Sequence, residues 1–183
     1  KARYLHKLWR EQRGSGTALE QGLALPDFPA FQGSSRFEPI AKSERGRVPS
    51  GYVSGKDARR ACEGAGKRLC TEAEWKRACR GENDLQFPYG ESYQQGVCNV
   101  FRAAHTGLLL YDDPSRNHTD PRLHLVNGPK GPLLRLTGGT LRCVSTWGSD
   151  GIFDMVGNLD EWVDDPEGTF LGGFYARGKK DGC

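Results

Sequence analysis

The chain has 183 residues, with 25 glycines, 10 prolines and a hydrophobic content of 36%, so we expect many turns and loops and not a helical bundle. The formal net charge is +3, from 26 basic and 23 acidic residues, and the even mixing of the two signs argues against nucleic-acid binding. No apolar run approaches the roughly 20 residues that cross a membrane, and no signal peptide is visible at Lys1, so we expect a mature, trimmed or fragmentary chain.

The first 47 residues are predicted to lead into the main domain. Leu5, Leu8 and Trp9 have helical spacing, which indicates either a short docking helix before Gly22 or a linker. Prolines and glycines interrupt any period between residues 24 and 47. We therefore expect an N-terminal helix and irregular lead-in over 1–47, and one domain over 48–183.

A first helix of this domain is predicted after Ser54. The Ser54 hydroxyl can cap it, Asp57 suits its positive end, and Gly66 can close it in the left-handed conformation. Small residues share one face of it: Ala58, Ala61, Cys62 and Ala65. Such a face permits close packing.

A second helix is predicted to begin at Thr71, which forms a capping box with Glu74, and to end at Gly81. Its buried face is expected to contain Trp75, Ala78 and Cys79. Beyond Arg80 the sequence predicts mostly loops, including a long unpatterned insertion over 112–139. Short strands are expected over 133–136, 151–156 and 169–175.

Six cysteines are spread along the chain without a CxxC motif or closely spaced histidines, which argues against a zinc site. An even number of cysteines in a loop-rich domain favours disulfides and an oxidising compartment. The sequence leaves all fifteen pairings open.

The segment from Gly151 to Val163 carries hard oxygen donors between glycines and apolar residues. Its donors are Asp154, Asn158, Asp160 and Glu161. A short loop that directs carboxylates and carbonyls to one point can hold calcium. The alternative is a buried turn whose polar groups bind the local backbone.

Several motifs, in order, resemble the formylglycine-generating enzyme (sulfatase-modifying factor) family over residues 48–183. They are GAGKRLCTEAEWKRACRG from Gly64, FPYG from Phe87, Cys98-Asn99, GIFDMVGNLDEW from Gly151 and Leu171-Gly172-Gly173. The resemblance implies an α+β fold of the C-type lectin-like kind, with few short strands, two short helices and many loops.

The resemblance also implies two calcium sites. One would use the side chains of Asp154 and Glu161 with the carbonyls of Gly157 and Leu159. Asn158 and Asp160 would then be structural. The other would use the Asn99 side chain, the Val100 carbonyl and a later carboxylate, for which Asp113 is preferred over Asp112.

Oxidising members of the family hold copper(I) between two cysteines that follow the Gly-Gly pair, because a soft ion prefers thiolates. Here Arg177 stands at the first of these positions, and Cys183 lies about one residue beyond the second. This argues against copper and against formylglycine generation. Cys183 is at most a weak catalytic candidate and more readily a structural half-cystine. The family has a further closing strand with a cysteine, which this sequence does not include. We therefore expect that one cysteine, Cys183 or another, has lost its partner.

Other branches of the family use iron bound by histidines. His118 and His124 lie six residues apart in the insertion, which fits neither a helix face nor a strand pair, so iron is not expected.

We therefore hypothesise a secreted, periplasmic or cell-surface module, stabilised by calcium and disulfides, that binds a peptide, protein or glycan through its loops. Two alternatives stay open. One is an oxidoreductase of the same superfamily, formylglycine-generating or non-haem iron in type, with an altered site. The other is a remnant that supports a larger polypeptide.

Overall fold

The computed structural model describes residues 38–51, 53–102, 105–115, 121–124, 126–128, 131–177 and 180–183. It divides into two compact units, one containing described residues of the 103–133 stretch and the other residues 39–102 and 134–183. Each unit is described by itself. The helix predicted before Gly22 lies outside the described residues, and the predicted boundary at residue 48 stays a prediction.

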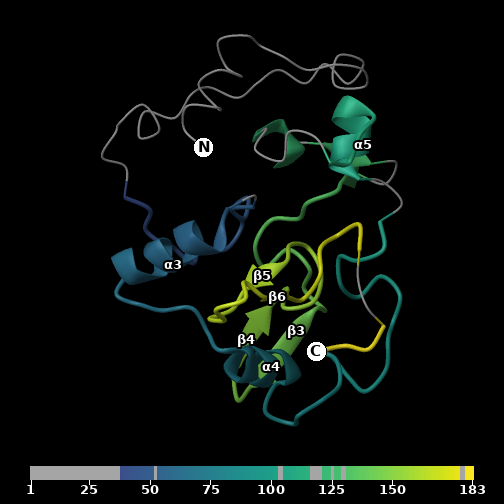
Figure 1. Ribbon diagram of the computed structural model, residues 1–183. Helices are drawn as coiled ribbons and strands as arrows, with labels where there is room; N and C mark the ends of the chain where they lie inside the picture. The colour runs from purple at the N-terminus through teal and green to yellow at the C-terminus, as the bar shows by residue number, and fades with distance from the viewer. Residues whose placement is uncertain are drawn as a thin grey trace. The chain divides into compact units, whose positions relative to one another are not determined.

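The described residues of the larger unit form two helices and four short strands, which Figure 1 labels. The helices are α3 (Gly55–Gly64) and α4 (Glu72–Arg80). The strands are β3 (Val144–Trp147), β4 (Asp150–Phe153), β5 (Glu161–Trp162) and β6 (Phe170–Leu171). Strands β3 and β4 form one antiparallel pair, with Val144 opposite Phe153, and β5 and β6 form another, with Glu161 opposite Leu171.

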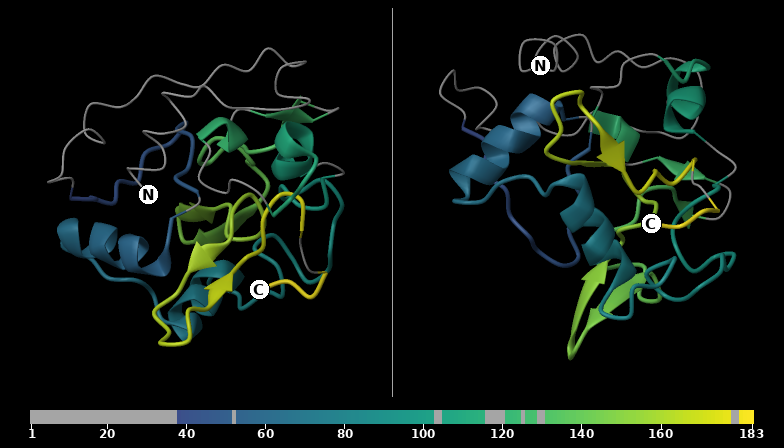
Figure 2. Two further views of the ribbon diagram at one scale, coloured as in Figure 1. Left: turned by 45° about the horizontal axis from the view of Figure 1, so that its top comes forward. Right: turned by 60° about the horizontal axis from the view of Figure 1, so that its bottom comes forward.

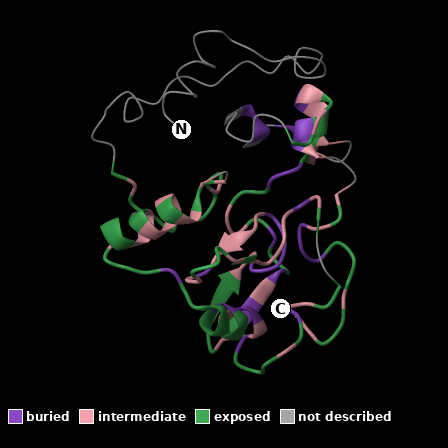
Figure 3. Ribbon diagram, in the orientation of Figure 1, coloured by how far each residue is buried: buried purple, intermediate pink, exposed green. Residues whose placement is uncertain are grey.

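Helix α3 begins and ends as the sequence predicts. Ser54 accepts a hydrogen bond from the Asp57 amide at 3.1 Å, and Gly66 follows the last turn with φ = +68°. No α3 residue is fully buried, as the pink and green helix in Figure 3 shows. The chain approaches α3 closely at Gly64, where an added Cβ would lie 2.7 Å from the Pro39 carbonyl oxygen.

Helix α4 has the predicted capping box, with reciprocal hydrogen bonds between Thr71 and Glu74. Trp75 and Cys79 are buried on its inner face. Its C-terminal end packs against β3, where the Ser145 hydroxyl donates to the Ala78 carbonyl at 2.6 Å. Figure 2 shows α4 alongside the β3–β4 hairpin.

The smaller unit contains α5 (Thr106–Tyr111), the 3₁₀ turn η2 (Pro121–His124), and the strands β1 (Asn127–Gly128) and β2 (Gly131–Pro132). The two strands pair antiparallel. The sequence did not predict α5, because its cap is His105, whose Nδ1 accepts from the Gly107 amide at 3.0 Å.

The predicted strands were only partly correct. The strand over 133–136 is wrong, since those residues are not in a strand, although Leu133 and Leu134 are buried. Strand β4 stops at Phe153 because Asp154 has φ = +62°. Strand β6 stops at Leu171 because Gly172 and Gly173 have φ of +86° and +76°.

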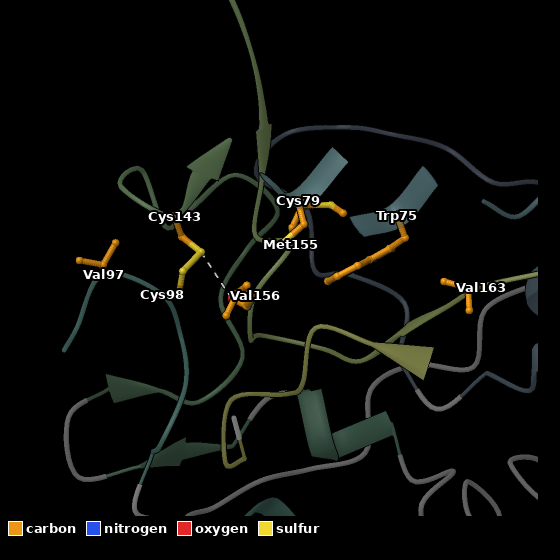
Figure 4. Close-up of a cluster of buried hydrophobic side chains, with 8 residues drawn as sticks. All are labelled: Trp75, Cys79, Val97, Cys98, Cys143, Met155, Val156 and Val163. Carbon is orange, nitrogen blue, oxygen red and sulfur yellow. Dashed lines mark hydrogen bonds between the residues drawn. A yellow bond between two sulfur atoms is a disulfide. The ribbon is translucent and has the colours of Figure 1, made fainter. Parts of the chain in front are cut away.

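The core of the larger unit combines aliphatic, aromatic and sulfur-containing side chains (Figure 4). Its buried members are Trp75, Cys79, Val97, Cys98, Cys143, Met155, Val156 and Val163. Two disulfides, Cys79–Cys183 and Cys98–Cys143, fix distant segments to this core, as the composition led us to expect. Among the described residues, the fold is therefore α+β with short elements and abundant loops. None of the described helices is long and apolar enough to span a bilayer.

Candidate functional site

The turn between β4 and β5 is built from an unusual run of left-handed residues. Asp154, Gly157 and Asn158 have φ of +62°, +81° and +65°. The Gly157 amide donates to the Gly172 carbonyl at 2.8 Å. A Cβ at Gly157 would lie 2.5 Å from the Asn99 carbonyl oxygen, so only glycine fits there without displacing a neighbour.

Asn158 holds this turn to two other segments. Its side-chain oxygen accepts from the Arg135 amide and from Asn99 Nδ2, both at 2.9 Å, and its Nδ2 donates to the Arg135 carbonyl at 3.1 Å. Its amide donates to the Asn99 carbonyl at 2.9 Å. These contacts match the structural role that the sequence predicts for Asn158.

Two carboxylates of the predicted first calcium site, Asp154 and Glu161, are close enough for their charges to interact. Burial raises the pKa of Glu161 to about 7; the Trp75 hydrogen bond lowers this pKa and the Asp154 charge raises it. Trp75 Nε1 donates to Glu161 Oε2 at 2.6 Å. As a whole residue Glu161 is only half-buried, but the first cause of its pKa shift is burial of the carboxyl group itself.

Burial also raises the pKa of Asp154, against hydrogen bonds from Thr140 and Gly138 that lower it. The Gly138 amide donates to Asp154 Oδ2 at 2.9 Å. Two partly desolvated carboxylates of like charge form an environment that a divalent cation would neutralise, and carboxylate oxygens are the donors that calcium prefers.

No group of three or more histidine, cysteine, aspartate and glutamate side chains suited to a metal occurs in the described part of the chain. A calcium ion at Asp154 and Glu161 would therefore depend on backbone carbonyls, for which Gly157 and Leu159 are the predicted donors, and on water. The residues present fit calcium on this condition.

The predicted second calcium site is divided between the two units. Asn99 and Val100 belong to the larger unit and Asp113 to the smaller one. Asp113 Oδ1 accepts hydrogen bonds from the Ser115 amide at 2.9 Å and hydroxyl at 2.6 Å. This ligand set stays a prediction.

Asp160 forms an ion pair with Arg177, a role that differs from hydrogen bonding within the turn. Arg177 Nη2 lies 3.1 Å from Oδ1 and 3.0 Å from Oδ2 of Asp160. The Arg177 guanidinium also lies over the rings of Phe174, at 5.1 Å, and Phe170, at 5.9 Å. At exposed sites an ion pair contributes about 0.2–1 kcal/mol, and a cation–π contact contributes about 0.5–1 kcal/mol.

Arg177 and Asp160 line a pocket of about 570 Å³. The other lining residues are Glu72, Trp75, Lys76, Val156, Phe170, Leu171, Gly172, Gly173, Asp181, Gly182 and Cys183. The sequence did not reveal this pocket, because its walls come from α4, from β6 and from the chain end. The only available signal was the Gly-Gly pair that follows β6.

Cys183 lies in the pocket wall, but its sulfur is bonded to Cys79. The weak catalytic candidate therefore offers no free thiol here. Of the six cysteines, Cys62 and Cys70 have free thiols, and burial raises the pKa of the Cys70 thiol. His118 lies outside the described residues and the His124 side chain is not described, so the prediction against histidine-bound iron stays a prediction.

The sequence profile of the family described as "Sulfatase-modifying factor enzyme 1-like domain" matches residues 27–180. The chain belongs to this family. The turn with Asp154 and Glu161 and the pocket with Arg177 both lie within the matched range.

Two relatives illustrate the range of the family. "Inactive C-alpha-formylglycine-generating enzyme 2" of Bos taurus is 28% identical over 85% of this chain and 38% of its own length. "Formylglycine-generating enzyme" of Mus musculus is 50% identical over 66% of this chain and 28% of its own length. The chain thus aligns with less than two fifths of each of these relatives.

Proposed function

We propose that this chain is an extracytoplasmic member of the sulfatase-modifying factor family, with a C-type lectin-like fold, that acts as a binding module and not as a formylglycine generator. The main support for this proposal is that Arg177 and the disulfide-bonded Cys183 both line one pocket. By family resemblance, these are the two positions near which the oxidising members have redox cysteines.

This donor set does not suit copper(I). The ion prefers two soft thiolates, whereas a guanidinium stays protonated and has no lone pair to offer. The Cys183 sulfur is held by Cys79. The bovine relative named as inactive lends support to a non-catalytic role.

Calcium would act as a structural ion. The side chains of Asp154 and Glu161 with the carbonyls of Gly157 and Leu159 would hold it, and it would neutralise two carboxylates that burial disfavours in their charged form. An ion bound there would connect the end of β4 with the start of β5. Asn99, Val100 and Asp113 are proposed for the second calcium ion.

The two disulfides support an oxidising compartment outside the cytoplasm. The pocket beside β6 is the proposed place for a peptide, protein or glycan ligand, since loops on a fixed scaffold commonly carry binding sites. Its lining includes both apolar and charged residues, which suits a ligand with both kinds of surface.

The test of the non-catalytic role is a direct assay. The purified chain is incubated with a sulfatase-type cysteine peptide, oxygen and copper(I), and mass spectrometry follows replacement of the thiol by an aldehyde. We expect the peptide to remain a thiol, while a formylglycine-generating enzyme assayed in parallel converts it. Aldehyde formation by this chain would overturn the proposal.

Calcium should stabilise the chain, because an ion that binds only the folded state raises the free energy of unfolding. At about 100 times its Kd, calcium would add about 2.7 kcal/mol. Glu161→Gln should abolish most of this increment, since the amide can still accept the Trp75 hydrogen bond but carries no charge. Thermal unfolding with calcium and with a chelator measures the effect. Glu167→Gln, at an exposed position, is the control and should respond like the parent.

A second candidate function is an oxidoreductase of the same superfamily with an altered site. The mouse relative, at 50% identity, is named as the active enzyme, and Cys62 and Cys70 are free thiols. If the chain does convert the peptide, serine substitutions of Cys62 and Cys70 should abolish conversion. Conversion that survives both substitutions would point away from these thiols.

A further inference from the structure

The side chain of Arg177 lies in the wall of the pocket beside β6, against an acidic residue and two aromatic rings. Its guanidinium contacts a carboxylate, Asp160, at 3.0 and 3.1 Å and lies over the rings of Phe170 and Phe174. A planar cation between a carboxylate and aromatic faces is a complete recognition arrangement for guanidinium, because the fork pairs with oxygen and the flat face stacks on the ring.

Each of the two rings also packs against another aromatic ring, in addition to its contact with Arg177. The Phe170 ring packs edge-on against Trp162 with the centroids 5.2 Å apart. The Phe174 ring packs edge-on against Tyr175 at 5.3 Å, and Tyr175 is buried. Each ring therefore has an aromatic neighbour that would remain if Arg177 moved away.

Arg177 is the loosest member of the arrangement. Its side chain is 57% exposed, whereas that of Asp160 is 25% exposed. An exposed ion pair is weak and is easily exchanged for another cation. The glycines of the same wall, Gly172 and Gly173, carry no side chain that would fill the space if Arg177 moved out.

We propose that Asp160, Phe170 and Phe174 form a guanidinium-binding site that Arg177 occupies in the free protein, and that a guanidinium group from outside replaces it. Arg177 then acts as an internal competitor for this site. This proposal rests on the proposed function, because a guanidinium-binding site would serve partner recognition only if the chain is a binding module.

The experiment titrates methylguanidinium into the full chain and into Arg177→Ala, and follows backbone amide signals by NMR. In Arg177→Ala we expect saturable shifts centred on residues 170–173, with a Kd about tenfold lower than in the parent, because the internal competitor is gone. Methylammonium, which lacks the planar fork, should bind the variant more weakly than methylguanidinium does.

Two further variants make the test specific. Asp160→Asn combined with Arg177→Ala should lose binding, since the carboxylate is gone. Arg45→Ala removes an arginine that also lies over an aromatic ring, Phe153 at 5.6 Å, and should leave methylguanidinium binding as in the parent. Amide spectra of each variant without ligand verify folding.

Absence of saturable shifts in a folded Arg177→Ala variant would overturn the proposal, as would equal gains in Arg45→Ala and Arg177→Ala. A short arginine peptide compared with methylguanidinium distinguishes the source. Tighter binding of the peptide supports a protein partner, and equal binding supports a small guanidino compound. The aldehyde and calcium measurements are independent of this titration, so failure of the site and failure of the proposed function remain distinguishable.

Discussion

Glycines and left-handed residues shape the pocket wall at the scale of single residues. Gly172 has φ = +86°, and a Cβ there would lie 2.6 Å from the Met155 carbonyl oxygen and 3.2 Å from Trp75 Cζ2. Gly96 has a similar φ of +80°, but nothing lies within 4 Å of its added Cβ. A side chain at Gly172 would therefore cause both backbone strain and steric overlap, whereas a side chain at Gly96 would cause backbone strain alone.

We therefore expect Gly172→Ala to destabilise the chain by about 3 kcal/mol or more, from left-handed strain together with overpacking. Gly96→Ala should cost about 1 kcal/mol, from strain alone. Denaturant unfolding of both variants measures the difference. Equal losses would show that the close approach of Met155 and Trp75 to Gly172 is of no consequence for stability.

The adjacent acidic residues Asp160 and Glu161 have different surroundings. They are adjacent in sequence, yet Glu161 faces Trp75 inside the unit, whereas Asp160 pairs with exposed Arg177 at the pocket. By spacing alone both were candidate metal ligands, and only the family resemblance favoured Glu161. The alternation of side chains along an extended segment decides which one is buried.

At the scale of elements, the start of α4 combines a capping box with an ion pair. Arg68 donates to both Glu74 oxygens, at 2.7 and 2.6 Å, and Glu74 Oε2 accepts from the Thr71 amide at 2.9 Å. These contacts, led by the Arg68 hydrogen bond, lower the pKa of Glu74 to about 2. The charged carboxylate is thus favoured in the folded state.

This shift predicts a pH dependence of stability. Because the folded pKa of Glu74 lies below its ordinary value of 4.5, its contribution is complete above that value and is lost as pH falls toward about 2. Glu74→Gln should therefore flatten the fall of unfolding free energy between these pH values. Denaturant unfolding across this range is the measurement.

A matched variant of that experiment is Glu63→Gln, which changes the net charge equally at an exposed position of α3. It should retain the pH dependence of the parent. If the unfolding free energy of Glu74→Gln fell with decreasing pH as steeply as that of the parent, the role assigned to the capping box would be contradicted.

The helices and strands differ in how far the sequence predicted them. Helices α3 and α4 were predicted with their caps, since Ser54 and Thr71 bond to amides three residues away. Strand β3 was not predicted, although its partner β4 follows after only two residues, and β5 and β6 are each only two residues long. Hydrogen bonds between residues a few positions apart can be predicted from a sequence, whereas the pairing of short strands depends on their packing context.

At the scale of the whole molecule, the disulfides connect segments that are distant in sequence. Cys98–Cys143 spans 45 residues and Cys79–Cys183 spans 104 residues. The second disulfide fixes the chain end beside α4, where the Cys183 amide also donates to the Gln86 carbonyl at 2.8 Å. This placement brings Cys183 and Gly182 into the pocket wall.

Removing the disulfides should destabilise the chain in proportion to the loop entropy that each one restricts. Replacing Cys98 and Cys143 together by alanine should cost about 4 kcal/mol, and replacing Cys79 and Cys183 together should cost about 5 kcal/mol. Denaturant unfolding under oxidising conditions measures both losses. Under a reductant the parent should approach the double variants, and a parent that is unaffected by full reduction would contradict this account.

The family, the two capped helices, the loop-rich α+β character and the presence of disulfides could all be predicted before the structure was known. These depend on contiguous motifs, on composition and on hydrogen bonds that reach a few residues. The candidate calcium ligands Asp154 and Glu161 were also identified at this level, because they lie in one uninterrupted motif.

The folded structure was needed to establish the pairing of the cysteines, the end of each strand and the contact of Arg177 with Asp160 and two aromatic rings. Each of these features involves residues that are distant in the sequence and come together only when the whole unit packs. Arg177 lies 17 residues from Asp160, and Cys183 lies 104 residues from Cys79. No local pattern encodes such contacts, since their energy comes from burial and charge in a geometry that exists only after folding.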